Sequence, residues 1–294
     1  MDARALFSTT MQEKTVILEQ YRFHMRARNL SPRTIEVAGD YLRPFLAVYD
    51  PFTVTRADLE QYLAAMFERC RPSTVWTAWR HLRSFFGWLE KEGDIDTNPM
   101  TGVTKPIVPE TEIPCLTNEE IKKLLSACAG TSKMLKRDRA ILAVMLDTGI
   151  RLSEVARLQV TDLGANGTIR VFGKGRKWRT VVLGVVAQGA VNRWLRTRSS
   201  GEGSLWTTGG NPLSSGSVRK ALGRLGRRAG VNFHPHMLRH TFIDNWLRNG
   251  GNEVDLARLC GWTTTRMAER YARQRANERA VTAHSQVRPL DALL

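Results

Sequence analysis

Three prolines between residues 106 and 114 constrain the fold of this chain more than any other feature. A proline has no backbone N–H to donate, and its ring disfavours helical backbone in the residue before it, so no helix or central strand should run through this segment. We therefore expect residues 106–114 to form an extended linker between two domains, which cover residues 1–105 and 115–294. A chain of 294 residues is long enough for two domains of ordinary size.

The first domain has the apolar spacing of helices. One helical pattern starts after Ser31-Pro32, where the serine can cap the helix and the proline can occupy its first turn. Two more patterns cover residues 54–69 and 72–89. The last of these is rich in aromatic residues, which at helical spacing are more typical of a bundle core than of a surface that stacks on nucleobases. We therefore expect a helical bundle.

The second domain mixes helical patterns with one change of period. Residues 117–120 form a capping box, and residues 138–147 predict a buried helix. Residues 168–183 alternate around a Gly-Lys-Gly turn, which predicts a β-hairpin with Lys174 near its tip. The predicted fold class is therefore mostly α: a helical N-terminal domain, followed by a mixed α/β, mainly helical domain with a small antiparallel sheet.

Positive charge is concentrated in the second part of the chain. Residues 1–105 carry 14 Lys and Arg against 13 Asp and Glu, whereas residues 106–294 carry 30 against 15. Within a net charge of +16, this distribution indicates a polyanionic partner. A solvated basic face remains an alternative, because charge runs often have no partner. The residues that we expect to face the polyanion are Arg33, Arg80, Arg83, Arg176, Lys177, Arg179, Arg219 and Lys220.

No sequence signal places the chain in a membrane or outside the cell. There is no run of about 18 apolar residues and no basic-then-apolar signal peptide. The four cysteines are scattered and form no Cys-x-x-Cys pair, so neither a zinc ribbon nor a redox motif is indicated. We expect a cytoplasmic protein that needs no metal or cofactor.

A spaced set of cationic and hydrogen-bonding residues in the second domain ends in a tyrosine. Arginine stays charged at any working pH, and its planar guanidinium matches phosphate oxygens two at a time. A tyrosine hydroxyl can attack phosphorus and become covalently attached to it. The set consists of Arg151, Lys174, His236, Arg239, Trp262 and Tyr271. Together these residue types predict cleavage of a DNA strand through a phosphotyrosine.

Each member of this set has a plainer interpretation when taken alone. A single tyrosine in a helix is usually an ordinary amphipathic residue, and a single arginine or lysine is usually a surface charge. His234, His236 and His240 could bind a metal, although no nearby acidic pattern completes such a site. The functional prediction therefore depends on the joint order of the residues.

Four short motifs in this region resemble those of the tyrosine recombinase (phage integrase) family. They are residues 148–154 (TGIRLSE), 173–179 (GKGRKWR), 236–241 (HMLRHT) and 259–262 (LCGW). Tyr271 follows one helix later. The helical patterns before the linker are similar to the family's core-binding domain. The resemblance covers roughly residues 13–285, and its strength is that the elements occur together and in order.

The resemblance implies a DNA strand transferase that uses neither metal nor ATP. Tyr271 would form a 3′-phosphotyrosine, and Lys174 would act as general acid on the departing 5′ oxygen. Preorganised donors would hold the phosphate, and neighbouring residues would orient these donors. The donors would be Arg151, His236, Arg239 and Trp262, and the orienting residues Glu154 and His240. The two domains would form a clamp around double-stranded DNA sites, and a homotetramer would exchange strands through a Holliday junction.

The biological role is predicted less directly. Trp262 stands where many family members have histidine, and its indole N–H can donate a hydrogen bond but cannot shuttle a proton. Tryptophan at this position occurs in a phage recombinase. We therefore expect integration or excision of a phage or mobile element, in a prokaryotic or phage-encoded, nucleoid-associated protein. Resolution of chromosome or plasmid dimers is the alternative within the family, and an accessory directionality factor could take part in either role.

Two alternatives lie outside recombination. One is a non-catalytic DNA-binding protein on the same fold, and the other is a type IB topoisomerase. Only about a dozen residues precede the helical domain, so we expect no arm-binding domain and recognition of core-type sites only. The segment 283–294 ends in apolar residues, and it could dock onto a neighbouring protomer or form a frayed tail.

Overall fold

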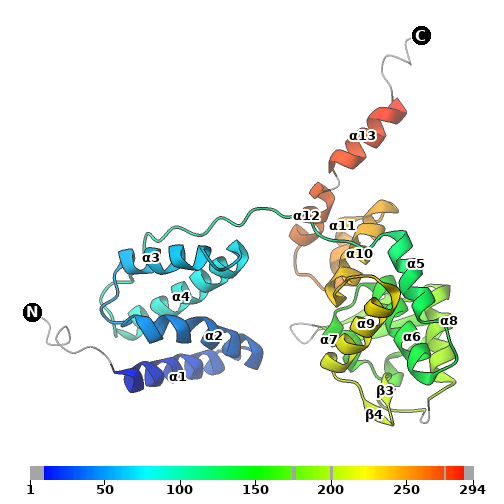
Figure 1. The fold of residues 1–294 in the computed structure, drawn as a ribbon, viewed down its shortest axis with the longest axis horizontal. Helices are drawn as coiled ribbons and strands as arrows, with labels where there is room; N and C mark the ends of the chain where they lie inside the picture. Colours follow the sequence, from blue (N-terminus) through cyan, green and yellow to red (C-terminus); the bar gives the residue numbers. More distant parts are fainter. Residues whose placement is uncertain (1–9, 174–176, 199–200, 275, 288–294) are drawn as a thin grey trace, which may run out of the picture. The chain divides into compact units, whose positions relative to one another are not determined.

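The chain folds into two compact units, Met1–Thr111 and Glu112–Leu294. This structure is a computed structural model, and it describes residues 10–173, 177–198, 201–274 and 276–287. The division between the units falls inside the predicted linker. Residues 103–117 contain no helix or strand, in keeping with the three prolines of this segment (Figure 1).

The first unit is a bundle of helices. Its helices are α1 (Met11–Ala27), α2 (Pro32–Val48), α3 (Arg56–Phe67) and α4 (Pro72–Glu92) (Figure 1). The predicted cap of α2 is present, since the Ser31 hydroxyl accepts the Thr34 amide at 3.1 Å. Thr55 and Asp58 cap α3 reciprocally, because each side chain accepts the other's backbone N–H. The three helices predicted for this domain are therefore confirmed.

The aromatic residues of α4 form the centre of this bundle. Phe85 and Phe86 are fully buried, together with Leu82 and Leu89 from the same helix and Phe45 from α2. Burying one such side chain contributes about 1.5–3 kcal/mol to stability. The prediction of an aromatic bundle core is thus confirmed for this helix. Two tryptophans nearer its start remain only partly buried.

The second unit is mainly helical and contains two small antiparallel sheets. Its helices are α5 (Asn118–Ala127), α6 (Lys133–Thr148), α7 (Leu152–Arg157), α8 (Val185–Leu195), α9 (Ser215–Ala229), α10 (Pro235–Arg248), α11 (Glu253–Cys260), α12 (Arg266–Gln274) and α13 (Ala276–Val287). Strands β1 (Thr168–Phe172) and β2 (Trp178–Val182) form the predicted hairpin, with Phe172 opposite Trp178. The second sheet pairs β3 (Thr207–Thr208) with β4 (Asn211–Pro212), and no sequence pattern predicted it.

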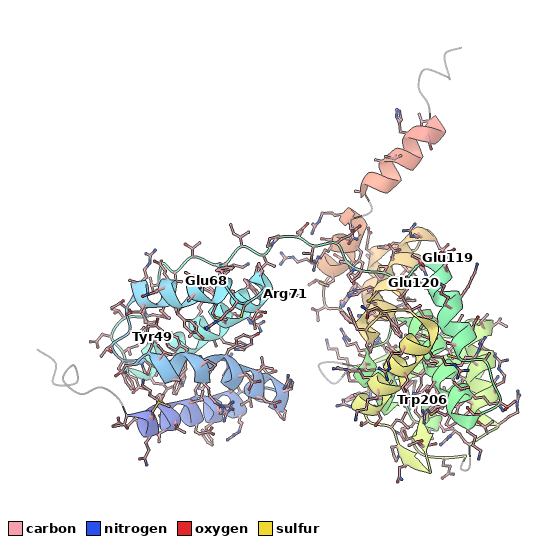
Figure 2. The ribbon with its side chains drawn as sticks, viewed as in Figure 1. Tyr49, Glu68, Arg71, Glu119, Glu120 and Trp206 are labelled. Atoms are coloured by element: carbon pink, nitrogen blue, oxygen red, sulfur yellow. The ribbon has the colours of Figure 1, made fainter. Side chains whose placement is uncertain are left out.

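Helix α6 lies at the centre of this unit and packs against α8, α9 and α10 (Figure 1). It starts before the predicted residue 138, because the Ser132 hydroxyl accepts the Leu135 amide at 3.2 Å and caps the helix there. Trp206, labelled in Figure 2, is fully buried in the same core. Its indole N–H donates to the Val155 carbonyl at 2.8 Å, so the core also fixes the end of α7.

At the edge of the unit, Glu119 and Glu120 occupy the first turn of α5 (Figure 2), where acidic side chains interact favourably with the helix dipole.

A smaller cluster joins α10, α11 and α12. Its buried members include Ile243, Leu256 and Tyr271, and Trp246 and Leu247 pack against it. These apolar residues of α10 therefore face the cluster. Ile113 is buried in it as well, so the end of the predicted linker belongs to this cluster. Among the described helices, none is both long and apolar enough to cross a membrane.

Candidate active site

Arg151 is held at the junction of two helices. Helix α6 ends at Thr148, Gly149 follows in the left-handed conformation with φ of 61°, and α7 begins directly after Arg151. The backbone N–H of Arg151 donates to Glu154 at 2.8 Å, and its Nη1 donates to the same carboxylate at 2.9 Å. Both the backbone and the side chain of Arg151 are therefore fixed by one buried acid.

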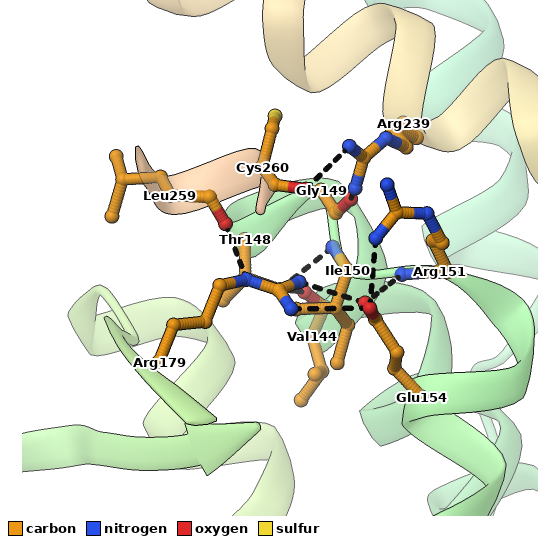
Figure 3. Close-up of polar contacts among 10 residues, drawn as sticks. All are labelled: Val144, Thr148, Gly149, Ile150, Arg151, Glu154, Arg179, Arg239, Leu259 and Cys260. Carbon is orange, nitrogen blue, oxygen red and sulfur yellow. Dashed lines mark hydrogen bonds and ion pairs between the residues drawn. The ribbon is translucent and has the colours of Figure 1, made fainter. Parts of the chain in front are cut away.

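Glu154 is shared by two arginines. Arg179 on β2 donates its Nη1 and Nη2 to the two carboxylate oxygens at 3.1 and 2.7 Å (Figure 3). Arg179 also donates its Nε to the Leu259 carbonyl at 2.6 Å. Burial opposes ionisation of Glu154, but the hydrogen bonds from Arg179 and the Arg151 amide, with the charges of both arginines, hold its pKa below the usual range. Glu154 is therefore an ionised carboxylate that organises this part of the site.

Arg239 is buried and bridges two turns. Its Nη1 donates to the Gly149 carbonyl at 2.6 Å and its Nη2 to the Cys260 carbonyl at 2.8 Å (Figure 3). Its guanidinium carbon lies 5.3 Å from the centroid of the Trp262 ring, within the range of a cation–π contact. Burial lowers the pKa of Arg239, but an arginine starts from so high a value that it stays charged at neutral pH. Arg239 thus ties the turn before Arg151 to the turn before Trp262.

Two histidines connect this region to the tyrosine. The rings of His236 and His240 lie 4.3 Å apart between centroids, and His240 Nδ1 hydrogen-bonds to the hydroxyl of Tyr271. Burial lowers the pKa of His236, and the charges of neighbouring cationic groups lower it further. Burial, again with nearby positive groups, lowers the pKa of His240 to about 4. Both rings are therefore neutral at neutral pH, and each can donate only one N–H.

Tyr271 is buried in the cluster between α10, α11 and α12, with 3% of its surface exposed. Burial also raises its pKa, which disfavours a free phenolate in this state. Its hydroxyl contacts His240, and His240 in turn contacts His236. A line of polar side chains thus runs from the buried tyrosine towards the surface.

Arg151, His236 and Arg239 converge on one open hollow of about 510 Å³. Arg219, at the start of α9, lies in the same lining. The described lining holds three arginines and two histidines and no carboxylate. Such a hollow is suited to a phosphate group, because every charged side chain in its wall is positive. Among the residues that the structure describes, no cluster of three or more His, Cys, Asp or Glu is arranged to hold a metal ion.

The other predicted site residues are distributed as follows. Lys174 and Arg176 lie outside the described residues. Trp262 is half-buried beside Arg239 and does not line the hollow. The predicted DNA-facing residues with exposed side chains are Arg33, Arg80, Arg83, Lys177, Arg219 and Lys220.

The structure corrects the prediction for Arg179. It is not a surface cation, because only 11% of its side chain is exposed and its guanidinium is bound to Glu154 and Leu259. The sequence carries a signal for this orientation. In a β-strand, residues two apart share a face, and Arg179 shares the inward face of β2 with the buried Val181.

Comparisons with known proteins point to one family. The Phage integrase family matches residues 114–278, and the Phage integrase N-terminal SAM-like domain matches residues 17–93. The chain is 32% identical over 254 residues to the tyrosine recombinase XerC of Oceanobacillus iheyensis. The aligned region covers 80% of this chain and 83% of that protein. It is 34% identical over 187 residues to the tyrosine recombinase XerC of Salmonella typhi, covering 61% of this chain and 62% of that protein.

Solved structures share the fold. A lambda integrase dimer bound to a COC′ core site superposes with a TM-score of 0.73 at 18% identity, covering 87% of this chain and 76% of that one. The XerH site-specific recombinase bound to a palindromic difH substrate superposes with a TM-score of 0.70 at 21% identity, covering 90% of this chain and 83% of that one. At such identities the likeness concerns the fold alone, and the family matches carry the assignment. The chain belongs to the phage integrase family of tyrosine recombinases, the site-specific DNA recombinases.

Proposed function

We propose that the hollow lined by Arg151, His236 and Arg239 binds the scissile phosphate of a DNA recombination site, and that Tyr271 cleaves the strand. The observation that carries this proposal is the convergence of these three side chains, from two separate motifs, on one hollow whose described lining contains no carboxylate. Preorganised positive donors of this kind stabilise the charge that develops on a five-coordinate phosphorus. Removing one such donor typically costs about 10²–10³ in rate.

The proposed cleavage step is an in-line displacement. The Tyr271 oxygen forms a bond to phosphorus while the bond from phosphorus to the 5′ oxygen breaks, which leaves a 3′-phosphotyrosine and a free 5′-hydroxyl. Lys174 gives a proton to the departing 5′ oxygen, and Trp262 supports the phosphate site beside Arg239. Reversal of the step by a 5′-hydroxyl rejoins the strand, so the energy of the broken bond is kept and no ATP is needed.

The tyrosine is not poised for this step in the present structure. Tyr271 does not line the hollow, and its hydroxyl is hydrogen-bonded to His240. The hydroxyl must leave His240 and reach the phosphate before attack, and the neutral His240 ring can accept the phenolic proton as the hydroxyl leaves. Active-site contacts often form fully only in the complex with substrate, so this geometry is compatible with the proposed nucleophile.

Double-stranded DNA is the proposed partner, and four protomers are the proposed assembly. The excess of Lys and Arg after residue 105 supports a DNA partner. The lambda integrase and XerH structures contain their DNA sites, and a lambda integrase tetramer is known bound to a Holliday junction. The clamp arrangement, an accessory directionality factor and a nucleoid location remain predictions.

Two biological roles compete. The relatives called XerC favour resolution of chromosome dimers, whereas Trp262 led the sequence analysis to favour integration or excision of a mobile element. The two roles differ in the pair of DNA sites, because a dimer resolvase joins two copies of one site whereas an integrase joins a site on the element to a different site in the host DNA. Offering both kinds of site from the source genome would therefore separate them.

A covalent-trapping assay tests the reaction. The full chain is mixed with nicked DNA from candidate sites, in EDTA and without ATP, and a denaturing gel reports covalent protein–DNA complexes. We expect a covalent complex with the parent chain and none with Tyr271→Phe, while both bind DNA. Binding without a covalent complex would support the non-catalytic alternative. A complex that persists in Tyr271→Phe would show that another residue is the nucleophile.

A further inference from the structure

We propose that Arg179 is a positioning residue for strand cleavage, a role that rests on the function proposed above. Arg179 does not touch the phosphate hollow. It acts through Glu154, which it shares with Arg151, and through the backbone on either side of the site. As a result, Arg151 stays in position to bind the phosphate, and its positive charge is not fully neutralised by Glu154.

Arg179 affects the charge that faces the hollow. Arg179 and Arg151 both donate to Glu154, whose side chain is 4% exposed, whereas the Arg151 side chain is 28% exposed (Figure 3). One carboxylate is thus shared by two guanidinium groups, and the trio keeps one net positive charge. The surplus lies with Arg151, because it is the more exposed arginine and lines the hollow.

Removing Arg179 would reverse this balance. Glu154 would keep a single cationic partner, and a buried carboxylate with too few partners is strongly unfavourable. Arg151 would then be drawn further onto Glu154, and the pair would carry no net charge. Arg151 lines the hollow, so the loss of net positive charge would act directly on a phosphate bound there.

Arg179 also contacts the backbone around the site. Arg179 donates its Nε to the Leu259 carbonyl at 2.6 Å. A Cβ added to Gly261 would lie 3.2 Å from Nη1 of Arg179, and one added to Gly173 would lie 2.9 Å from the same atom. Gly261 directly precedes Trp262, and Gly173 directly precedes Lys174. The guanidinium therefore packs against the chain next to two further proposed site residues.

These contacts join three elements that are far apart in the sequence. Arg179 lies 25 residues from Glu154 and 80 residues from Leu259. A single side chain thus connects the β-hairpin, the start of α7 and the end of α11. Misplacing reacting groups by about 1 Å can cost about 100-fold in rate, so a residue with this position can be essential without touching the substrate.

The test compares Arg179→Met with Arg137→Met in the full chain. Arg137 is the matched control, because it is also a buried arginine that shares a carboxylate: it pairs with Asp138 at 2.6 Å, and Arg224 approaches the same group at 3.6 Å. Arg137 does not line the hollow. Both variants lose a buried ion pair, but only Arg179→Met alters the proposed site.

The first readout is the rate of covalent-complex formation on two nicked DNA substrates. One carries the normal scissile phosphate, and the other a methylphosphonate, in which a methyl group replaces one charged oxygen. We expect Arg179→Met to slow the reaction about 100-fold on the phosphate, with a much smaller loss on the neutral methylphosphonate, and with DNA affinity unchanged. Arg137→Met should react like the parent chain on both substrates. Equal losses by Arg179→Met on both substrates would overturn the charge argument.

The second readout does not depend on cleavage. Inorganic phosphate is titrated into the protein while NMR follows the arginine Nε–H signals of the hollow. We expect Arg179→Met to weaken phosphate binding, and Arg179→Met combined with Glu154→Gln to restore it, because the net positive charge returns. Unchanged phosphate affinity in Arg179→Met would refute the inference. The parent chain could show this loss and recovery of phosphate binding and still never form a covalent complex. That result would support the role of Arg179 in charging the hollow and would count against the proposed function.

Discussion

Replacing Gly149 with alanine should damage both the stability and the chemistry of the second unit. Gly149 ends α6 with φ of 61°, in the left-handed region, and its carbonyl accepts Nη1 of Arg239. A Cβ at this position would lie 2.9 and 3.0 Å from Cγ and Cε1 of Phe242, and closer still to Cδ1. The aromatic ring on α10 would therefore have to move.

The cost has two parts. The left-handed conformation costs a residue with a Cβ about 1–2 kcal/mol. Displacing a ring from a packed site typically costs about 1–3 kcal/mol more. The sum, about 2–5 kcal/mol, is a large share of the ~5–15 kcal/mol that stabilises an ordinary domain.

Gly230→Ala separates the two parts. Gly230 ends α9 with φ of 65°, and a Cβ there would meet nothing within 4 Å. This variant should therefore pay the conformational cost alone, about 1–2 kcal/mol. Calorimetric unfolding of the full chain measures both variants against the parent. Adding Phe242→Leu to Gly149→Ala should recover part of the difference, because a smaller side chain can make room.

Cleavage gives a second measurement of the same change. Moving the Gly149 carbonyl displaces the guanidinium of Arg239, so covalent-complex formation should fall by about 100-fold at a temperature where the variant is still folded. Gly230→Ala should leave the rate unchanged under the same conditions. Equal losses of stability in the two variants, with equal rates, would show that Phe242 moves aside freely and that the end of α6 does not position Arg239.

Two further predictions concern acid sensitivity and DNA binding. The free energy of unfolding of the second unit should fall as pH drops from about 6.5 to about 4, because an unfolded histidine binds a proton near 6.5 whereas burial keeps the pKa of His240 at about 4. Thermal unfolding at stepped pH should show this slope, and His240→Asn should flatten it; an identical slope in the variant would exclude His240 as its source. In the first unit, Arg80 is an exposed cation that we expect to contact a DNA phosphate, so Arg80→Ala should weaken DNA binding for all sequences and reduce the salt dependence by about one counterion. Arg43→Ala, which removes an exposed arginine 3.5 Å from Asp40, is the control, and equal binding by both variants would contradict a DNA contact by Arg80.

Features set by local interactions were predictable from the sequence. The caps at Ser31, Thr55 and Thr117 involve residues three apart, so the sequence alone specifies them. The hairpin was visible from its alternating period. The short pair β3–β4 was not, because two residues per strand leave no periodicity to detect.

In the candidate site, too, some features were predictable from the sequence and others were not. Motif order predicted which side chains would gather, and Arg151, His236 and Arg239 do line one hollow. Contacts between distant parts of the chain were not predictable, since Arg239 lies 90 residues from Gly149 and Arg179 lies 80 residues from Leu259. Such contacts follow from tertiary packing, and no local pattern specifies their partners. The buried position of Tyr271 belongs to the same class.

The buried tyrosine has a mechanical consequence for the proposed reaction. Tyr271 shares its apolar cluster with Ile113 from the end of the predicted linker, and the Ile113 amide donates to the side chain of Gln274, three residues after Tyr271, at 3.1 Å. Any movement of α12 that carries Tyr271 towards the hollow must therefore loosen contacts at the start of the second unit as well. In the proposed reaction, contacts made with DNA would supply the free energy for that movement, because the isolated chain holds the hydroxyl against His240. Binding energy used in this way would couple cleavage to correct engagement of the DNA site. The hollow can then be formed before DNA binds while Tyr271 reaches the phosphate only afterwards.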